Sequence, residues 1–209
     1  MLLVNIVTMK NLLLKENYAS RNLWGKMNLL TEQQVIEISK GLKWTDENLS
    51  SAVLVGGTAV VHYVSGDRTL TPDLDFMVAD IDSVKAELSN NHIEFKDLHT
   101  GGEYSLGITV PGFNADYLSS SAGNEILNDL ILKTPDITII GSYNVKIIRP
   151  ELLAIMKLEL GRDQDINDGF ALLASGKCDL DRYKSYASAL KESLKDFEAI
   201  VGYQALITG

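Results

Sequence analysis

The hydrophobic pattern of residues 52–78 predicts a strand, a tight turn, a helix and a second strand. The apolar, β-branched run 52–55 is typical of a buried strand, and Gly56-Gly57 ends it. Residues 58–64 are predicted to form a short helix, which a polar turn separates from the strand predicted over 73–78. The rest of the chain is best understood around this unit.

Two aspartates lie on the second of these predicted strands. Side chains alternate between the faces of a strand, so Asp73 and Asp75 are predicted to share one face and Leu74 and Phe76 the other. Two like charges side by side repel each other, and they persist most readily where a cation compensates them. The aspartate pair opposite a Gly-Gly turn is therefore the first candidate for a functional site.

Helical periodicity accounts for many of the remaining apolar positions. A capping box, Thr31 with Gln34, opens a helix predicted over residues 32–42. Pro150 occupies the favoured first turn of a helix that Gly161 ends. Further helices are predicted over residues 82–90, 124–133, 165–174 and 181–203, and further strands over residues 93–98, 104–110, 113–118, 136–140 and 144–148.

This order of elements predicts the α+β fold class, with a mixed β-sheet flanked by helices and a helical C-terminal part. The 209 residues suit one domain with a small helical annex. We predict an N-terminal extension over residues 1–30, an α/β domain over residues 31–149 and a helical C-terminal subdomain over residues 150–209.

Composition narrows the classes of function. With 45% hydrophobic residues the chain can bury a substantial core, and Cys178 is its one cysteine, so an internal disulfide is excluded and a reducing cytoplasm is indicated. The net charge of −9 argues against a broad grip on long DNA or RNA, because such surfaces are usually basic. A small anionic ligand held through metal ions stays compatible with this charge.

The N-terminal residues are apolar but do not read as a membrane or export signal. Asn5, Lys10 and Asn11 interrupt the apolar run, which is too short to span a bilayer and lacks a positive leading region. We expect a soluble, cytoplasmic protein with no membrane partner. Residues 1–27 are predicted to pack as a peripheral helix or to be disordered. Met27, just ahead of a strong helix start, leaves open whether residues 1–26 belong to the native protein.

Asp116 is a third candidate carboxylate. It lies on the strand predicted over residues 113–118, with Asn114 on the same face. Three carboxylates on adjacent strands could hold one or two Mg²⁺ (or Mn²⁺) ions, which would align an attacking hydroxyl, an α-phosphate and a leaving pyrophosphate. A Gly-Gly turn that opens a helix offers backbone N–H groups to a triphosphate, and glycine lets the phosphate come close.

This pattern resembles the nucleotidyltransferase superfamily typified by polymerase β. The resemblance is carried by Gly56-Gly57, by Asp73-Leu74-Asp75 and by the lone Asp116 on a later strand. It implies a nucleotidyltransferase-like fold that transfers a nucleoside monophosphate from an NTP to an acceptor hydroxyl and releases pyrophosphate. The resemblance covers roughly residues 53–173.

One branch, the AbiEii-type toxin nucleotidyltransferases, is more closely similar. Gly56-Gly57-Thr58-Ala59, Arg68-Thr69 and Asp73-Leu74-Asp75-Phe76 carry that likeness. In this branch a later helix bears a lysine and an Asp-x-x-Asp pair follows. Lys157 and Asp165-Ile166-Asn167-Asp168 stand at those places, with Gln164 where the branch commonly has a lysine.

The resemblance also implies a role for each of these residues. Asp73, Asp75 and Asp116 would hold Mg²⁺, and Asp116 would also take the proton of the acceptor hydroxyl. The triphosphate would lie in a cradle of Gly56, Gly57 and Thr58, which Arg68 approaches from its loop. Lys157 would neutralise a phosphate or pair with Asp165, and Asp168 would support that wall of the site.

Several alternatives remain open from the sequence. The acceptor could be RNA such as tRNA, a protein or a small molecule, and the branch implies a toxin or phage-defence role with a cognate antitoxin as partner. Lys157 could simply extend to solvent, and Asp165 and Asp168 could only favour a helix N-terminus. The competing hypothesis for the whole chain is a catalytically silent nucleotidyltransferase-like module that binds a nucleotide or a protein partner.

Overall fold

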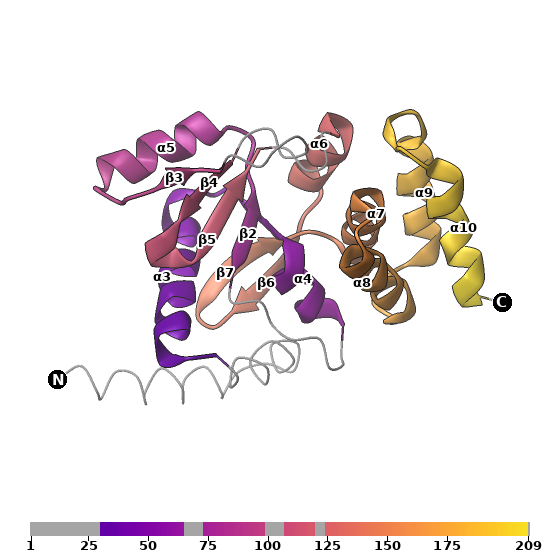
Figure 1. The fold of residues 1–209 in the computed structure, drawn as a ribbon, viewed down its shortest axis with the longest axis horizontal. Helices are drawn as coiled ribbons and strands as arrows, with labels where there is room; N and C mark the ends of the chain where they lie inside the picture. Colours follow the sequence, from indigo (N-terminus) through magenta and orange to yellow (C-terminus); the bar gives the residue numbers. More distant parts are fainter. Residues whose placement is uncertain (1–29, 65–72, 99–106, 120–123, 209) are drawn as a thin grey trace.

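The computed structural model describes residues 30–64, 73–98, 107–119 and 124–208. Their strands form one seven-stranded sheet in the order β3-β4-β5-β2-β1-β7-β6, with helices on both faces (Figure 1). The α+β prediction is confirmed. The elements are α3 (Glu32–Asn48), β1 (Val53–Val55), α4 (Gly56–Tyr63), β2 (Leu74–Met77), α5 (Ile81–Asn90), β3 (Lys96–Asp97), β4 (Gly107–Val110), the 3₁₀ turn η1 (Pro111–Phe113), β5 (Ala115–Leu118), α6 (Glu125–Lys133), β6 (Asp136–Ile140), β7 (Tyr143–Ile147), α7 (Pro150–Leu160), α8 (Asp163–Ala174), α9 (Leu180–Ala189), the 3₁₀ turn η2 (Lys191–Ser193) and α10 (Phe197–Thr208).

The sheet is mixed, because it contains both parallel and antiparallel strand pairs. Strand β1 pairs with β2 in antiparallel fashion and with β7 in parallel. Strand β2 pairs with β5 in parallel. The remaining neighbours, β3 with β4, β4 with β5 and β6 with β7, are antiparallel. The strand that carries the first aspartates therefore lies in the middle of the sheet.

One face of the sheet packs against α3 and α5. Leu54, Phe76 and Tyr117 occupy matching positions on β1, β2 and β5, so their side chains share this face. The rings of Phe76 and Tyr117 stack with centroids 5.4 Å apart, and Trp44 of α3 meets Tyr117 edge-on at 5.9 Å. These aromatic contacts join α3 to the sheet.

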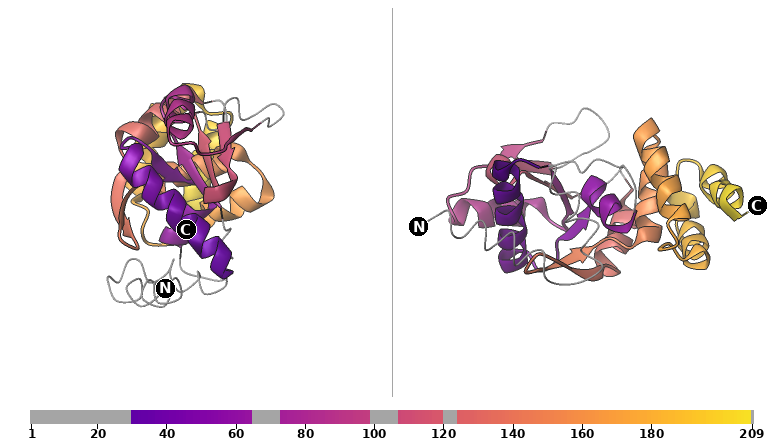
Figure 2. Two further views of the ribbon diagram at one scale, coloured as in Figure 1. Left: turned by 90° about the vertical axis from the view of Figure 1, so that its left-hand side faces the viewer. Right: turned by 90° about the horizontal axis from the view of Figure 1, so that it is seen from below.

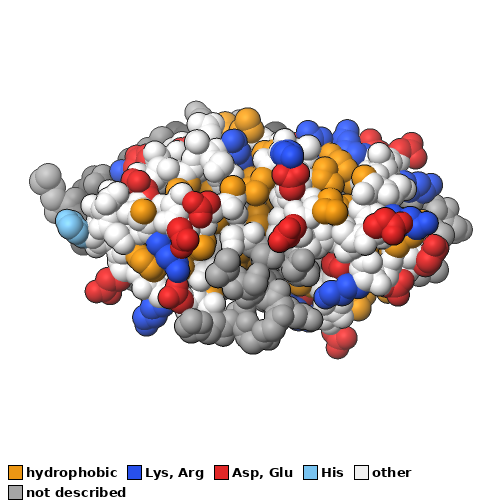
Figure 3. Space-filling model, turned by 90° about the horizontal axis from the view of Figure 1, so that it is seen from above, with side chains coloured by type: hydrophobic (Ala, Val, Ile, Leu, Met, Phe, Trp, Pro, Cys, Tyr) orange, Lys and Arg blue, Asp and Glu red, His pale blue; other side chains and the backbone are white. Residues whose placement is uncertain are grey.

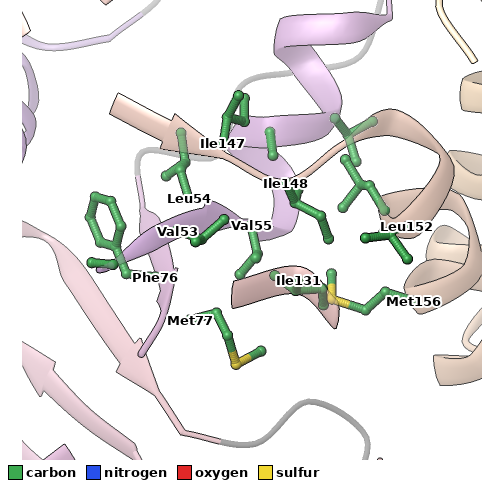
Figure 4. Packing of buried hydrophobic residues seen from close by; sticks show 14 of the residues in the cluster. Val53, Leu54, Val55, Phe76, Met77, Ile131, Ile147, Ile148, Leu152 and Met156 are labelled. Carbon is green, nitrogen blue, oxygen red and sulfur yellow. The ribbon is translucent and has the colours of Figure 1, made fainter. Parts of the chain in front are cut away.

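The other face packs against α4, α6 and α7. Val53, Val55 and Met77 point toward this layer, where they meet Ile131 of α6 and Met156 of α7 (Figure 4). All five side chains are buried. Because the aspartate at position 75 alternates with Phe76, it also belongs to this face, beside α4 and α7.

The helices α7 to α10 gather at one end of the sheet, and α10 lies outermost (Figures 1 and 2). The single helix predicted over residues 181–203 is wrong: it is divided into α9, η2 and α10. The break has a physical cause, because the chain between α9 and α10 bonds to other helices. Asn124 donates to the carbonyl of Ser193, and the N–H of Lys195 donates to the carboxylate of Glu159.

Three smaller boundary predictions also change. The helix that Thr31 caps continues to Asn48, beyond the predicted end at residue 42. Strand β3 is only Lys96–Asp97. Asn114 has a left-handed backbone that ends η1, so it precedes β5 and does not share the strand face of Asp116. None of the helices in the described part of the chain is long and apolar enough to cross a membrane.

Candidate functional site

The register of the sheet brings two of the predicted carboxylates together. Asp75 of β2 pairs directly with Asp116 of β5, so both side chains lie on the same face of neighbouring strands. Asp73 stands one residue ahead of β2, at the same end of the sheet. The fold thus places all three predicted aspartates in one region, although they are far apart in the sequence.

The Gly-Gly turn lies directly against Asp75. Val55, the last residue of β1, pairs with Asp75, and α4 begins at the next residue, Gly56. Gly56 has a φ of +65°, and a Cβ there would fall 1.9 Å from Oδ2 of Asp75. The N–H of Gly57 donates a hydrogen bond to the Asp75 carboxylate. Glycine at position 56 is therefore required both for its backbone conformation and for this close approach.

Thr58 connects the helix to the strand that bears the aspartates. Its hydroxyl is buried in the contact and donates to the carbonyl of Asp73 at 2.8 Å. This bond holds the start of β2 close to the first turn of α4. Arg68, the other residue predicted to contact the triphosphate, lies outside the described residues.

The three aspartates bring several negative charges close together, and this proximity changes the pKa values of Asp75 and Asp116. Burial, together with the charges of Asp73 and Asp116, raises the pKa of Asp75 to about 7. Lys157 and the N–H of Gly57 oppose this rise in pKa. Burial and the charge of Asp73 also raise the pKa of Asp116, against a hydrogen bond from Thr109. A cation bound among these carboxylates would remove their mutual repulsion.

Lys157 forms a buried ion-pair network between α7 and α8. Its Nζ lies 2.6 Å from Oδ1 of Asp165 and 3.4 Å from Oδ2 of Asp168, and the three side chains are 7%, 4% and 2% exposed. Arg162 donates to the second oxygen of Asp165, and Gln164 donates to Asp168 at 3.0 Å. Of its two predicted roles, Lys157 takes the pairing with Asp165, and its charge acts on Asp75 from within the protein.

The residues present fit a divalent cation in one respect that the structure shows directly. Oδ1 of Asp73 is buried and accepts no hydrogen bond from the described residues, which leaves a carboxylate oxygen without compensation. Within the same ranges, no group of three or more His, Cys, Asp or Glu side chains is already arranged around a metal position. Coordination of Mg²⁺ by Asp73, Asp75 and Asp116 stays a prediction.

Thr109 is a site residue that the sequence reasoning missed. It pairs with Asp116 across β4 and β5, and its side chain hydrogen-bonds the Asp116 carboxylate. The available signal was a polar residue alternating with Ile108 and Val110, both of which are fully buried. That pattern marks the side of β4 that faces away from α3 and α5.

Cys178 lies outside this site and is buried. Burial and the charges of Glu151 and Asp179 raise the pKa of its thiol to about 12, so the thiol stays protonated at neutral pH. A buried structural thiol accounts for Cys178.

Comparison with known proteins adds a fold-level likeness. No protein-family model matches the sequence, and no curated protein matches it. Among solved structures, the chain is similar to an antigenic nucleotidyltransferase-like protein from Paracoccidioides brasiliensis, with 18% identity over 83% of this chain and 94% of that chain. The TM-score is 0.49. A likeness of this size carries no argument about function, which depends on the geometry described above.

Proposed function

We propose that the chain is a nucleotidyltransferase that moves a nucleoside monophosphate from an NTP to an acceptor hydroxyl and releases pyrophosphate. One observation carries the proposal: Asp75 and Asp116 are register partners on adjacent strands, with Asp73 beside them and the Gly56-Gly57 turn against Asp75. The sequence motifs that resemble the superfamily are thus brought together in space, as its chemistry requires.

In this proposal Asp73, Asp75 and Asp116 would hold Mg²⁺ or Mn²⁺. The metal, when bound, supplies charge neutralisation for the phosphates and for the leaving pyrophosphate. Asp116 is half-buried, so an acceptor hydroxyl can reach it, and we assign it to take the proton, as the resemblance to the superfamily implies. The first turn of α4 would face the triphosphate.

Lys157 has an indirect part in the proposed reaction. Its ammonium is enclosed with Asp165 and Asp168, and its positive charge lowers the pKa of Asp75. We assign it to keeping Asp75 ionised. Because the lysine is buried and held by two carboxylates, its charge acts on neighbouring groups inside the protein and is little screened by solvent.

The acceptor and the biological role are further parts of this proposal. On the face of the molecule in Figure 3, basic and acidic side chains are interspersed. The net charge of −9 disfavours a long nucleic acid, so a protein or a small molecule fits better than a large RNA such as tRNA. A toxin or phage-defence role with a cognate antitoxin is supported only by the resemblance to the AbiEii branch.

The test is transfer of label from each of the four α-labelled NTPs, with Mg²⁺ or Mn²⁺, to panels of RNA, protein and small-molecule acceptors. Pyrophosphate release is measured in parallel. We expect transfer by the wild type and a loss of at least about 100-fold in Asp75→Asn, because the amide would be a weaker ligand for the metal that neutralises the reacting phosphate. Asp46→Asn, an exposed aspartate of α3, serves as the matched control. Label transfer that survives Asp73→Ala with Asp75→Ala would refute the assignment.

A silent binding module is the second candidate, and one observation favours it. The N–H of Gly57, which a triphosphate would need as a donor, is already bonded to Asp75. Thermal shift separates the two functions, since a ligand that binds only the folded state raises Tm by mass action. A rise in Tm with NTP and Mg²⁺, without pyrophosphate release, would identify the binding module.

A further inference from the structure

We propose that Thr109 is a positioning residue of this site: its hydroxyl holds the Asp116 carboxylate in the orientation that the site needs. The inference rests on the proposed function, because it assigns Thr109 to the same cluster of carboxylates. Thr109 itself touches neither metal nor substrate in this assignment, and it acts through Asp116.

The sheet register carries the geometry. Thr109 of β4 pairs with Asp116 of β5, and Asp116 pairs with Asp75 of β2. Directly paired residues share a face, so the three side chains form one row across three neighbouring strands, at intervals of about 4.8 Å. Asp116 is the middle member of the row, with a hydroxyl on one side and a carboxylate on the other.

The two neighbours act on Asp116 in opposite senses. Asp75 carries the same charge as Asp116 and repels it, and the charge of Asp73 also acts on Asp116. The Thr109 hydroxyl is the donor in its bond to Asp116, since an ionised carboxylate can only accept. The hydroxyl has a single proton to donate, so its bond restricts the rotation of the carboxylate and leaves further acceptor positions of the group for the site.

Local structure makes Thr109 a rigid donor. Threonine is β-branched, so its χ1 angle is restricted on a strand. Ile108 and Val110 on either side are fully buried in the opposite layer, which fixes the backbone from which the hydroxyl projects. The hydroxyl therefore holds Asp116 without a large loss of side-chain entropy.

Outer hydrogen-bond partners of carboxylates that ligate metals typically contribute 10–100-fold to metal affinity or activity. Three variants test whether Thr109 is such a partner. Thr109→Val keeps the shape and removes the hydroxyl, and Thr109→Ser keeps the hydroxyl. Thr138→Val makes the same exchange at a half-buried threonine of the edge strand β6, away from the site.

Binding of Mn²⁺ in the absence of NTP, followed by electron paramagnetic resonance, is the first measurement, and kcat and KM for nucleotidyl transfer are the second. We expect Thr109→Val to weaken Mn²⁺ binding and to lower kcat by about tenfold or more, with the KM for NTP little changed. Thr109→Ser should retain most of both properties. Thr138→Val should match the wild type, and thermal unfolding shows that each variant is folded.

Two distinct results would overturn the inference. If Thr109→Val binds Mn²⁺ and turns over like the wild type while Asp75→Asn does not, the site stands and Thr109 has no part in it. If Thr109→Ser is as impaired as Thr109→Val, the effect is one of packing and not of the hydroxyl. A third result would refute the proposed function itself. In that case the wild type and Asp75→Asn would bind Mn²⁺ equally, because the aspartates would not form a metal site.

Discussion

At the scale of single residues, the surroundings of Asp75 disfavour its ionised form. Burial of its carboxylate, together with the charges of two other aspartates, raises its pKa to about 7, although the first turn of α4 donates a hydrogen bond to it. Gly56 makes this arrangement sterically possible, since any side chain there would collide with the Asp75 carboxylate. Catalytic and binding groups are often held in such unfavourable surroundings, which their ligands then relieve.

The raised pKa of Asp75 predicts a pH dependence of stability. The folded state binds this proton more tightly than the unfolded chain, whose aspartates have a pKa near 3.8. The stability that the Asp75 proton gives to the folded state is therefore complete below about pH 4, and it is lost as the pH rises through about 7. Without metal, we expect Asp75 to lower the free energy of unfolding by roughly 2–4 kcal/mol between pH 4 and pH 8.

Denaturant unfolding at several pH values, without divalent cations, measures this effect. Asp75→Asn should lose much less stability over the same range than the wild type. Asp73, Asp116 and Lys157 are the charged groups that act on Asp75, and they remain in the variant. Asp46→Asn on the exposed side of α3 should keep the wild-type profile. Equal slopes for wild type and Asp75→Asn would contradict the assignment.

At the scale of elements, the contact between α7 and α8 brings Lys157 and its carboxylates together. Gly169 of α8 lies so close to α7 that an added Cβ would be 2.7 Å from Cγ of Leu158. This approach lets α8 place Asp165 and Asp168 around the Lys157 ammonium. A closely packed helix pair can hold a buried ion network because its charges are paired in place.

Replacement of Gly169 tests this packing. Gly169→Ala should lower the free energy of unfolding by about 1–3 kcal/mol, because the new methyl group overpacks the contact with Leu158. Gly202 of α10 is the matched control, since an added Cβ there meets nothing within 4 Å. Gly202→Ala should be neutral or stabilise by about 0.5–1 kcal/mol. Urea unfolding measures both, and a stabilised Gly169→Ala would disprove the close contact.

At the scale of the whole molecule, α7 belongs to the core of the α/β layer as much as to the C-terminal helices. Every residue from Pro150 to Glu159 is buried. Glu151 accepts from the N–H of Asp179, and Glu159 accepts from the N–H of Lys195. Carboxylates of one helix thus anchor the backbone of the segments that follow it.

Truncation tests the dependence of the sheet on these helices. A chain that ends at Arg149 would expose the apolar face formed by Val55, Met77 and Ile131, which α7 covers (Figure 4). We expect this chain to lack a cooperative thermal transition and to bind a hydrophobic dye. A chain that ends at residue 196 loses only α10 and should unfold cooperatively at a lower Tm. Cooperative unfolding of the shorter chain would show that residues 31–149 fold independently.

Much of this protein is determined by local sequence. The capping box at Thr31, Pro150 at the start of α7 and Gly161 at its end all act within a few residues, so the start of α3 and both ends of α7 were predicted closely. The strand alternation around Asp75 likewise placed it on the correct face. The motif order selected Asp73, Asp75 and Asp116, which the fold places at one end of the sheet, and their role as metal ligands stays a prediction.

The tertiary structure decided what depends on distant partners. The break between α9 and α10 arises because Asn124 and Glu159 bond to backbone groups between them, and no local pattern reveals such bonds. The pairing of β2 with β5 places Asp116 beside Asp75 and Thr109 beside Asp116. Periodicity shows which face a residue occupies, whereas the order and register of the strands determine which residues become neighbours.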